Sequence, residues 1–184
     1  MMSNFLQTFS EIIKILHSEN IAYMVVGSLA SMSYGEPRLT KDMDMVLSCD
    51  PGIGLKLAKL FSPPDYYLPP QEIMGQEIVN RRQFNLLHIP TGLKVDFIIQ
   101  KADAFAAHEF ERRVTVSLLP NFDVMMATPE DVIVKKLAYF QEGRSSKHIS
   151  DIRGILAHTE VDREYIEHWT NLLNLQAEWQ SCLV

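Results

Sequence analysis

The sequence predicts an α+β protein in which a part that mixes helices and strands is followed by a C-terminal helical part. Short apolar runs rich in β-branched residues alternate with helical patterns as far as residue 126, and no strand pattern recurs after Thr128-Pro129. A chain of 184 residues fits one domain, or one domain with a helical appendage. We therefore expect an α/β domain over residues 1–127 and a helical region over residues 128–184.

Local patterns place the individual elements of the N-terminal part. Apolar residues from Phe5 to Leu16 recur at intervals of three and four, which predicts an amphipathic first helix. Later helices are expected where this spacing returns, over residues 29–34, 51–61, 71–80 and 102–113. Strands are expected over residues 21–26, 41–48, 83–89, 93–100, 114–119 and 122–126, and residues 65–70 form a proline- and tyrosine-rich connector.

The helical part opens with a set of residues typical of a helix start. Thr128 is the expected N-cap, Pro129 suits the first helical position, and Glu130-Asp131 favour the positive end of the helix dipole. Apolar stripes then predict three or four helices, beginning at Ile133 and ending near Leu175.

Composition and charge exclude several classes of protein. The formal net charge of −6 argues against nucleic-acid binding through an extended basic surface, although a local basic cleft is compatible with this charge. No apolar run approaches the roughly 20 residues that a membrane span needs, and no signal pattern opens the chain. Cys49 and Cys182 lie far apart, so we expect unpaired thiols in a reducing compartment. The expectation is a soluble cytoplasmic protein without a membrane partner.

Two short motifs suggest a metal–nucleotide site. An apolar strand ends in Gly27-Ser28, and a later strand opens on Asp42 and Asp44, two residues apart. Because side chains on a strand alternate, both carboxylates point to one side of the sheet. Oxygen ligands at this spacing suit Mg²⁺, and the amides of a Gly-Ser turn suit the phosphates that accompany Mg²⁺.

A third carboxylate, Asp96, lies within an apolar strand. Burying an aspartate alone costs on the order of several kcal/mol, so it must be hydrogen-bonded, paired or metal-bound. Two explanations are open at this point, a metal ligand and an edge-strand aspartate paired with a lysine. In the first, Asp96 would join Asp42 and Asp44 around one or two divalent ions, which would clamp a triphosphate and help deprotonate an acceptor hydroxyl.

These motifs resemble a known superfamily. The order Gly27-Ser28, Asp42-Met43-Asp44 and then Asp96 in an apolar strand resembles the polymerase-beta-type nucleotidyltransferases over roughly residues 21–99. That resemblance implies a nucleotidyltransferase fold, with a mixed β-sheet flanked by helices and followed by a C-terminal helical region.

The helical part resembles the AbiEii/MenT-like branch, small bacterial nucleotidyltransferases of which several are toxins of toxin–antitoxin pairs. Lys136, with Lys135 directly beside it, matches the helix lysine of that branch. In the segment from Lys147 to Arg153, Asp151 matches the second acidic position, while His148 stands where the first Asp is common.

The resemblance also implies residue roles. Asp42 and Asp44 would bind the metals that hold the triphosphate, and Asp96 would share the catalytic metal. Ser28 and the backbone at Gly27 would contact the terminal phosphates. Lys136 would steady the nucleotide phosphates or the developing charge, and Asp151 would orient that lysine. The implied cofactor is Mg²⁺, with two ions bound and Mn²⁺ as an alternative.

The expected function is Mg²⁺-dependent transfer of a nucleoside monophosphate from an NTP to a hydroxyl of RNA, such as tRNA, or of a protein. A toxin of this kind would have a cognate antitoxin as its partner. Two alternatives stay open, a non-catalytic nucleotide- or partner-binding module of the same fold and a small-molecule (antibiotic-type) nucleotidyltransferase.

Overall fold

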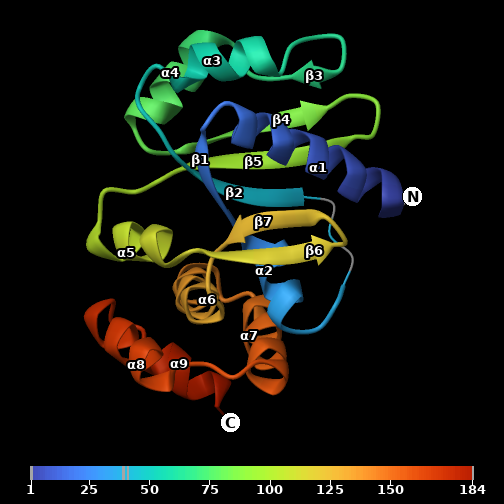
Figure 1. Cartoon of the computed structure of the whole chain (residues 1–184). Coiled ribbons are helices and arrows are strands. Elements are labelled where there is room, and N and C mark those ends of the chain that lie inside the picture. The colour runs from blue at the N-terminus through green and yellow to red at the C-terminus, as the bar shows by residue number, and fades with distance from the viewer. Residues whose placement is uncertain (1, 39, 41, 184) are drawn as a thin grey trace.

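A mixed β-sheet forms the centre of the computed structural model, which describes residues 2–38, 40 and 42–183 (Figure 1). Within these residues the sheet has seven strands in the order β3-β4-β5-β2-β1-β7-β6. Their bounds are β1 Ala22–Val26, β2 Asp42–Ser48, β3 Tyr66–Tyr67, β4 Gln83–His88, β5 Leu93–Ile99, β6 Val114–Leu119 and β7 Phe122–Met126. The predicted α+β class is confirmed.

Helices surround this sheet. Those of the N-terminal part are α1 Met2–Ser18, α2 Gly27–Tyr34, α3 Ile53–Leu60, α4 Gln71–Val79 and α5 Ala104–Arg112. From residue 128 onward the described residues hold only the helices α6 Pro129–Gly143, α7 Ser146–His158, α8 Arg163–Leu172 and α9 Gln176–Cys182. Figure 1 shows these four helices gathered below the β6–β7 side of the sheet. A domain boundary near residue 128 stays a prediction.

The predicted strands agree with the structure to within one residue at each end, except that Lys41, the first residue of one predicted strand, lies outside the described residues. One prediction was wrong. The connector over residues 65–70 contains β3, which pairs with the end of β4. A two-residue strand is too short to show alternation, and contacts of the Tyr66 ring with Phe61 and His88, at 5.2 and 5.0 Å, hold it in place.

The register of three central strands positions the candidate site. β1 runs antiparallel to β2 with Val26 opposite Asp44, and β2 runs parallel to β5 with Asp44 opposite Asp96. The end of β1, and Gly27 after it, therefore lies beside the carboxylates of the two neighbouring strands.

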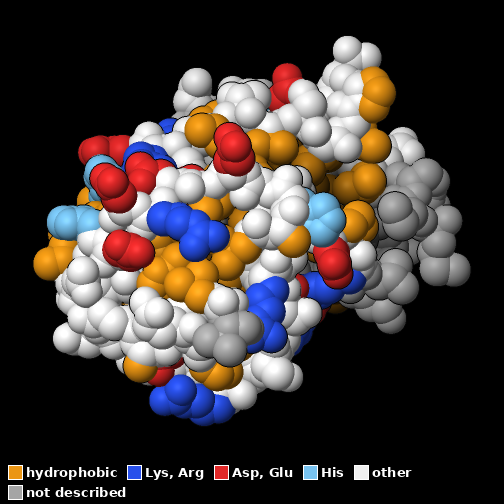
Figure 2. Space-filling model, turned by 90° about the horizontal axis from the view of Figure 1, so that it is seen from below, with side chains coloured by type: hydrophobic (Ala, Val, Ile, Leu, Met, Phe, Trp, Pro, Cys, Tyr) orange, Lys and Arg blue, Asp and Glu red, His pale blue; other side chains and the backbone are white. Residues whose placement is uncertain are grey.

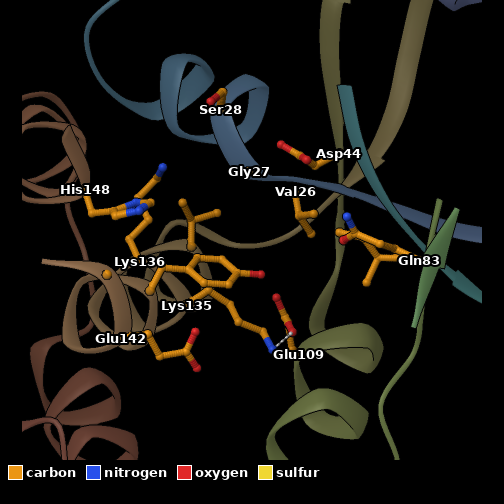
Figure 3. Close-up of a pocket in the computed structure, with 14 residues that line it drawn as sticks. Val26, Gly27, Ser28, Asp44, Gln83, Glu109, Lys135, Lys136, Glu142 and His148 are labelled. Atoms are coloured by element: carbon orange, nitrogen blue, oxygen red, sulfur yellow. Dashed lines mark ion pairs between the residues drawn. The ribbon is translucent and has the colours of Figure 1, made fainter. Parts of the chain in front are cut away.

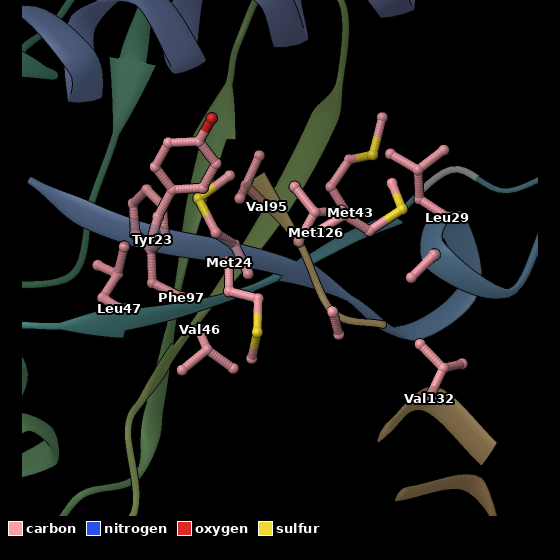
Figure 4. Close-up of a cluster of buried hydrophobic side chains, with 14 of the residues drawn as sticks. Tyr23, Met24, Leu29, Met43, Val46, Leu47, Val95, Phe97, Met126 and Val132 are labelled. Atoms are coloured by element: carbon pink, nitrogen blue, oxygen red, sulfur yellow. The ribbon is translucent and has the colours of Figure 1, made fainter. Parts of the chain in front are cut away.

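The core explains which face of β2 carries those carboxylates. Met43 and Met45 are fully buried, while Asp42 is exposed and Asp44 is half-buried, as alternation predicts. Figure 4 shows Met43 within a cluster of buried side chains from several strands, among them Met24 and Phe97. Burying a side chain of this size stabilises the fold by roughly 1.5–3 kcal/mol, so slipping the register by one residue is strongly disfavoured.

The start of α6 ties the helical part to α5. The Thr128 hydroxyl oxygen accepts a hydrogen bond from the Asp131 backbone amide, which confirms the predicted N-cap. Glu130 and Asp131 are buried, and Arg112 of α5 reaches them at 3.2 and 3.5 Å. The acidic first turn therefore anchors α6 through a specific arginine as well as through the helix dipole.

A close helix contact joins the two parts at α2. A Cβ on Gly35, which follows α2, would lie 2.8 Å from the Gly154 carbonyl carbon of α7, so only glycine fits there.

The predicted unpaired thiols are confirmed, since Cys49 and Cys182 are free. Among the described helices, none combines the length and the apolar character that crossing a membrane requires.

Candidate functional site

A cavity of about 510 Å³ opens where the central strands end against α6. Its wall takes residues from β1, β2, β4 and β5 on the sheet side, and from α2, α5, α6 and α7 on the helix side. Of the site residues predicted from the sequence, Gly27, Ser28, Asp44 and Lys136 line it (Figure 3). Asp42, Asp96 and Asp151 do not line it, although Asp96 lies opposite Asp44 and Asp151 contacts Lys136.

Gly27 is required by its approach to Asp44. Its φ of +65° is a left-handed conformation, and a Cβ at this position would lie 2.0 Å from the Asp44 Oδ2 atom. The Ser28 backbone amide donates a hydrogen bond to the Asp44 carboxylate. The Gly-Ser turn thus holds the Asp44 carboxylate directly against the first turn of α2.

The pKa of Asp44 is raised above its usual value. Burial is the largest cause, and the neighbouring carboxylates of Asp96 and Asp42 add repulsion, while the Ser28 amide and Lys136 oppose the shift. Three acidic side chains therefore repel one another at one end of the sheet. A bound cation would relieve this repulsion.

One carboxylate oxygen of Asp96 is paired with a lysine, and the other has no hydrogen-bond partner. Its Oδ2 atom lies 3.0 Å from Lys94 Nζ, and its Oδ1 atom is buried without a hydrogen-bond partner. This hydrogen bond raises the pKa of Lys94. Of the two open explanations for Asp96, pairing with a lysine is therefore observed, although β5 is an interior strand and not an edge strand.

Within the described part of the chain, no three His, Cys, Asp or Glu side chains already stand close enough together to hold a metal ion. The oxygen donors of Asp44 and Asp96 lie on adjacent strands at one register position, but Asp96 is held by Lys94, and Asp42 lies two residues before Asp44, at the start of β2. A cation could use the Oδ2 atom of Asp96 only if the Lys94 ammonium moved away from it.

A buried ion-pair network connects the Gly-Ser turn to the helical part. Lys136 Nζ lies 2.6 Å from Asp151 Oδ2, with 6% and 9% of the two side chains exposed. Arg38 contacts both ends of this network, because its Nε atom lies 3.1 Å from Asp151 Oδ1 and its Nη2 donates to Ser28 Oγ at 2.6 Å. The network thereby connects α2 and the loop that follows it to α6 and α7, which lie about 100 residues later in the sequence.

The network sets the charges of its members. Burial alone would raise the pKa of Asp151, but hydrogen bonds from Arg38 and Lys136 outweigh it and hold that pKa below the usual value. Burial lowers the pKa of Lys136, and Asp151 opposes this shift. Asp151 is thus the main group that keeps the lysine charged at this depth.

Comparison with solved structures identifies the fold. An antigenic nucleotidyltransferase-like protein from Paracoccidioides brasiliensis matches with a TM-score of 0.58 and 20% identity, over 97% of this chain and 91% of that one. The fold is that of the nucleotidyltransferases. At this identity the comparison speaks for the fold alone.

Two structures of ANT(2'')-Ia share the nucleotidyltransferase fold. The crystal structure in complex with adenylyl-2''-tobramycin has a TM-score of 0.60 and 14% identity, over 96% of this chain and 99% of that one. The solution structure of this antibiotic-resistance factor has a TM-score of 0.55 and 13% identity, over 98% and 96%. No family model matches the sequence, and no curated protein matches it significantly. The AbiEii/MenT-like branch stays a prediction.

Both candidate lysines of this nucleotidyltransferase fold line the cavity, in different surroundings. Lys136 is buried in the network, while Lys135 is partly exposed and lies 3.7 Å from Glu109 Oε2 and 5.3 Å from the centre of the Phe105 ring. His148 also lines the cavity, with its ring 5.8 Å from that of Tyr139. Burial lowers the pKa of His148, and the charge of Lys136 adds to this shift.

Two residues of the site were missed by the sequence analysis. Arg38 sits in a loop without any hydrophobic period, and its closest sequence signal is its position four residues before Asp42. Glu109 lies on the amphipathic helix α5, where a glutamate is expected to face solvent, yet it is 2% exposed and lines the cavity. A periodicity count that flagged polar residues on an apolar helix face could have found it.

Proposed function

We propose that this protein is a metal-dependent nucleotidyltransferase that transfers a nucleoside monophosphate from an NTP to an acceptor hydroxyl. The observation that carries the proposal is the convergence of the Gly27–Ser28 turn with Asp44 and Asp96, placed side by side by strand register. Lys136 in the same cavity supplies a fixed positive charge for phosphates. The nucleotidyltransferase fold supports this proposal.

The chemistry of the donor set supports Mg²⁺ as the cofactor. Mg²⁺ prefers carboxylate oxygens, and the buried Oδ1 atom of Asp96 has an open lone pair. We propose that Asp42, Asp44 and Asp96 hold one or two Mg²⁺ ions, or Mn²⁺ in their place. A bound ion of this kind polarises the transferred phosphoryl group and favours loss of the acceptor's proton. The Lys94 side chain is 37% exposed, so its ammonium can move into solvent when a cation takes its place.

The residues other than the proposed metal ligands would bind the phosphates. Lys136, held by Asp151, would neutralise charge that develops on the phosphates. Arg38 and Ser28 would lie at the phosphate end of the cavity, where the Arg38 guanidinium already fixes the Ser28 hydroxyl. Because the Ser28 amide is bound to Asp44, Ser28 would use its hydroxyl for phosphate contact.

Two acceptor classes are compatible with this proposal. The resemblance of the helical part to the AbiEii/MenT-like branch favours RNA, such as tRNA, or a protein as acceptor, with a toxin role and a cognate antitoxin. A small-molecule acceptor is the second candidate, and the observation that favours it is the similarity to ANT(2'')-Ia over nearly the whole length of both chains.

Label transfer tests the proposal. The purified protein is incubated with Mg²⁺, each radiolabelled NTP and one acceptor pool, which is total bacterial tRNA, total protein or an aminoglycoside. We expect transfer to one pool, and a loss of about a hundredfold or more in Asp44→Asn and Asp96→Asn. Asp65→Asn, an exposed aspartate remote from the cavity, serves as the matched control.

The outcomes separate the candidates. The pool that takes up label identifies the acceptor class. Undiminished transfer in both site variants would show that the carboxylates do not carry the reaction. NTP binding without transfer to any pool would favour the non-catalytic module.

A further inference from the structure

Glu109 is a buried carboxyl group in the cavity wall that the proposed transfer does not use. It comes from α5 and lies on the side of the cavity away from Ser28 (Figure 3). Only 3% of its side chain is exposed. A glutamate at this depth needs partners, because burying a carboxyl group without them is unfavourable.

The partners of Glu109 are incomplete. Its Oε2 atom has the Lys135 ammonium at 3.7 Å, and its Oε1 atom is buried without any hydrogen-bond partner. Burial raises the pKa of Glu109 to about 7, against the effect of Lys135. The group therefore has an unused acceptor atom in the cavity wall, and a small turn of the side chain would bring that atom within reach of a donor from a bound molecule.

The cavity around Glu109 suits a flat ring. Val26, Ile98 and Val132 give it apolar walls, and Tyr139 adds an aromatic ring that is 47% exposed. Its volume of about 510 Å³ is within the usual range for small-molecule sites. The same cavity begins at Ser28 and Lys136, where the proposed function places the phosphates. A nucleotide bound by its phosphates at that end would place its base toward Glu109.

We propose that Glu109 is a specificity residue that accepts a hydrogen bond from the exocyclic amino group of the nucleobase. The base would lie against Tyr139 and the apolar wall, and Lys135 beside Glu109 would donate to a ring nitrogen or keto oxygen on the same edge. The inference rests on the proposed function, because the phosphate end of the cavity fixes which way the nucleotide lies. It predicts that a base without an exocyclic amine binds more weakly.

Calorimetry with non-reactive NTP analogues and Mg²⁺ tests this with the intact chain. Three matched pairs are compared, ATP with purine riboside triphosphate, GTP with inosine triphosphate, and CTP with UTP. The second member of each pair lacks the exocyclic amine. We expect the amine-bearing member of at least one pair to bind about tenfold tighter, as is usual for one hydrogen bond to a buried carboxyl group.

Variants of α5 assign that preference to a side chain. Glu109→Met, similar in length but without an acceptor, should remove the preference, and Glu109→Gln, which keeps a carbonyl oxygen, should reduce it. Glu111→Met is the matched control, because Glu111 is exposed on the same helix and does not line the cavity. It should bind as the wild type does. Thermal unfolding checks that each variant is folded.

Three results would overturn the inference. In the first, the wild type binds both members of every pair equally. In the second, Glu109→Met keeps the preference for the amine-bearing member. In the third, which applies if Glu109→Met does not fold, Glu109→Gln keeps that preference at full strength. Each of these three results would leave the proposed nucleotidyltransferase function standing. Absence of binding of any NTP would overturn the proposed function together with the inference.

Discussion

Asp96 and Glu109 are two buried carboxylates that each keep one oxygen without a partner. Lys94 pairs with the other oxygen of Asp96 at 3.0 Å, and Lys135 with that of Glu109 at 3.7 Å. Each lysine is only partly buried, so each pair can open toward solvent when a ligand binds. At the residue scale, both groups combine an oxygen without a partner with a lysine that can move away.

Glu109 should make the stability of the fold depend on pH. Its folded-state pKa of about 7 is above the ordinary value of 4.5, because burial and the carboxylates of Asp131 and Asp103 outweigh the ammonium of Lys135. Between these values the folded protein binds a proton that the unfolded chain has lost, so stability falls as pH rises through this window. We expect the free energy of unfolding to fall by roughly 3 kcal/mol across this pH window.

Urea denaturation of the wild type and Glu109→Gln at pH 5 and pH 8 measures this loss. The variant cannot ionise, so we expect it to gain stability relative to the wild type by about 2–3 kcal/mol between the two pH values. A difference between the two proteins that stays constant with pH would contradict the buried-carboxyl account.

At the scale of elements, α6 is the helix on which the site depends. Its first turn binds Arg112 of α5, its middle carries Lys135 and Lys136, and Lys136 reaches Asp151 of α7. The start of this helix could be predicted because N-caps and first-turn acids are local signals. The partners could not, because Arg38 and Asp151 are 113 residues apart in the sequence and meet only in the folded chain.

Asp151→Asn tests whether the buried network holds α6 and α7 in place. The substitution leaves the amino group of Lys136 buried without its anionic partner, so we expect the free energy of unfolding to fall by about 3 kcal/mol. Urea denaturation measures it, with Asp65→Asn at an exposed position as control. A change below about 0.5 kcal/mol would mean that the pair adds nothing to stability.

At the scale of the whole molecule, the sequence predicts the class of fold and the order of nearly all its elements. Alternation in β2 and helical spacing in α1 depend on which side faces the core, and that information is local. The strand order β5-β2-β1 is not local, so the register of Asp44 against Asp96 could be expected only from a resemblance. β3 was missed because two residues carry no period.

The surface of the helical region carries charges of both signs. Figure 2 shows acidic and basic side chains mixed with apolar ones on the face seen from below, where Figure 1 places the C-terminal helices. A net charge of −6 provides no long-range attraction for RNA as a whole. An RNA acceptor would therefore depend on local contacts near the cavity, whereas a small acceptor needs only the cavity itself.

The most direct test of the account is whether NTP binding depends on a divalent cation held by the carboxylates. Calorimetry with a non-reactive NTP analogue is performed in Mg²⁺ and in EDTA, with the wild type, Asp44→Asn and the control Asp65→Asn. We expect the wild type and the control to bind the analogue in Mg²⁺ at least about tenfold more tightly than in EDTA, and Asp44→Asn to lose this difference. Equal binding in Mg²⁺ and EDTA by the wild type, or a full Mg²⁺ effect in Asp44→Asn, would contradict it.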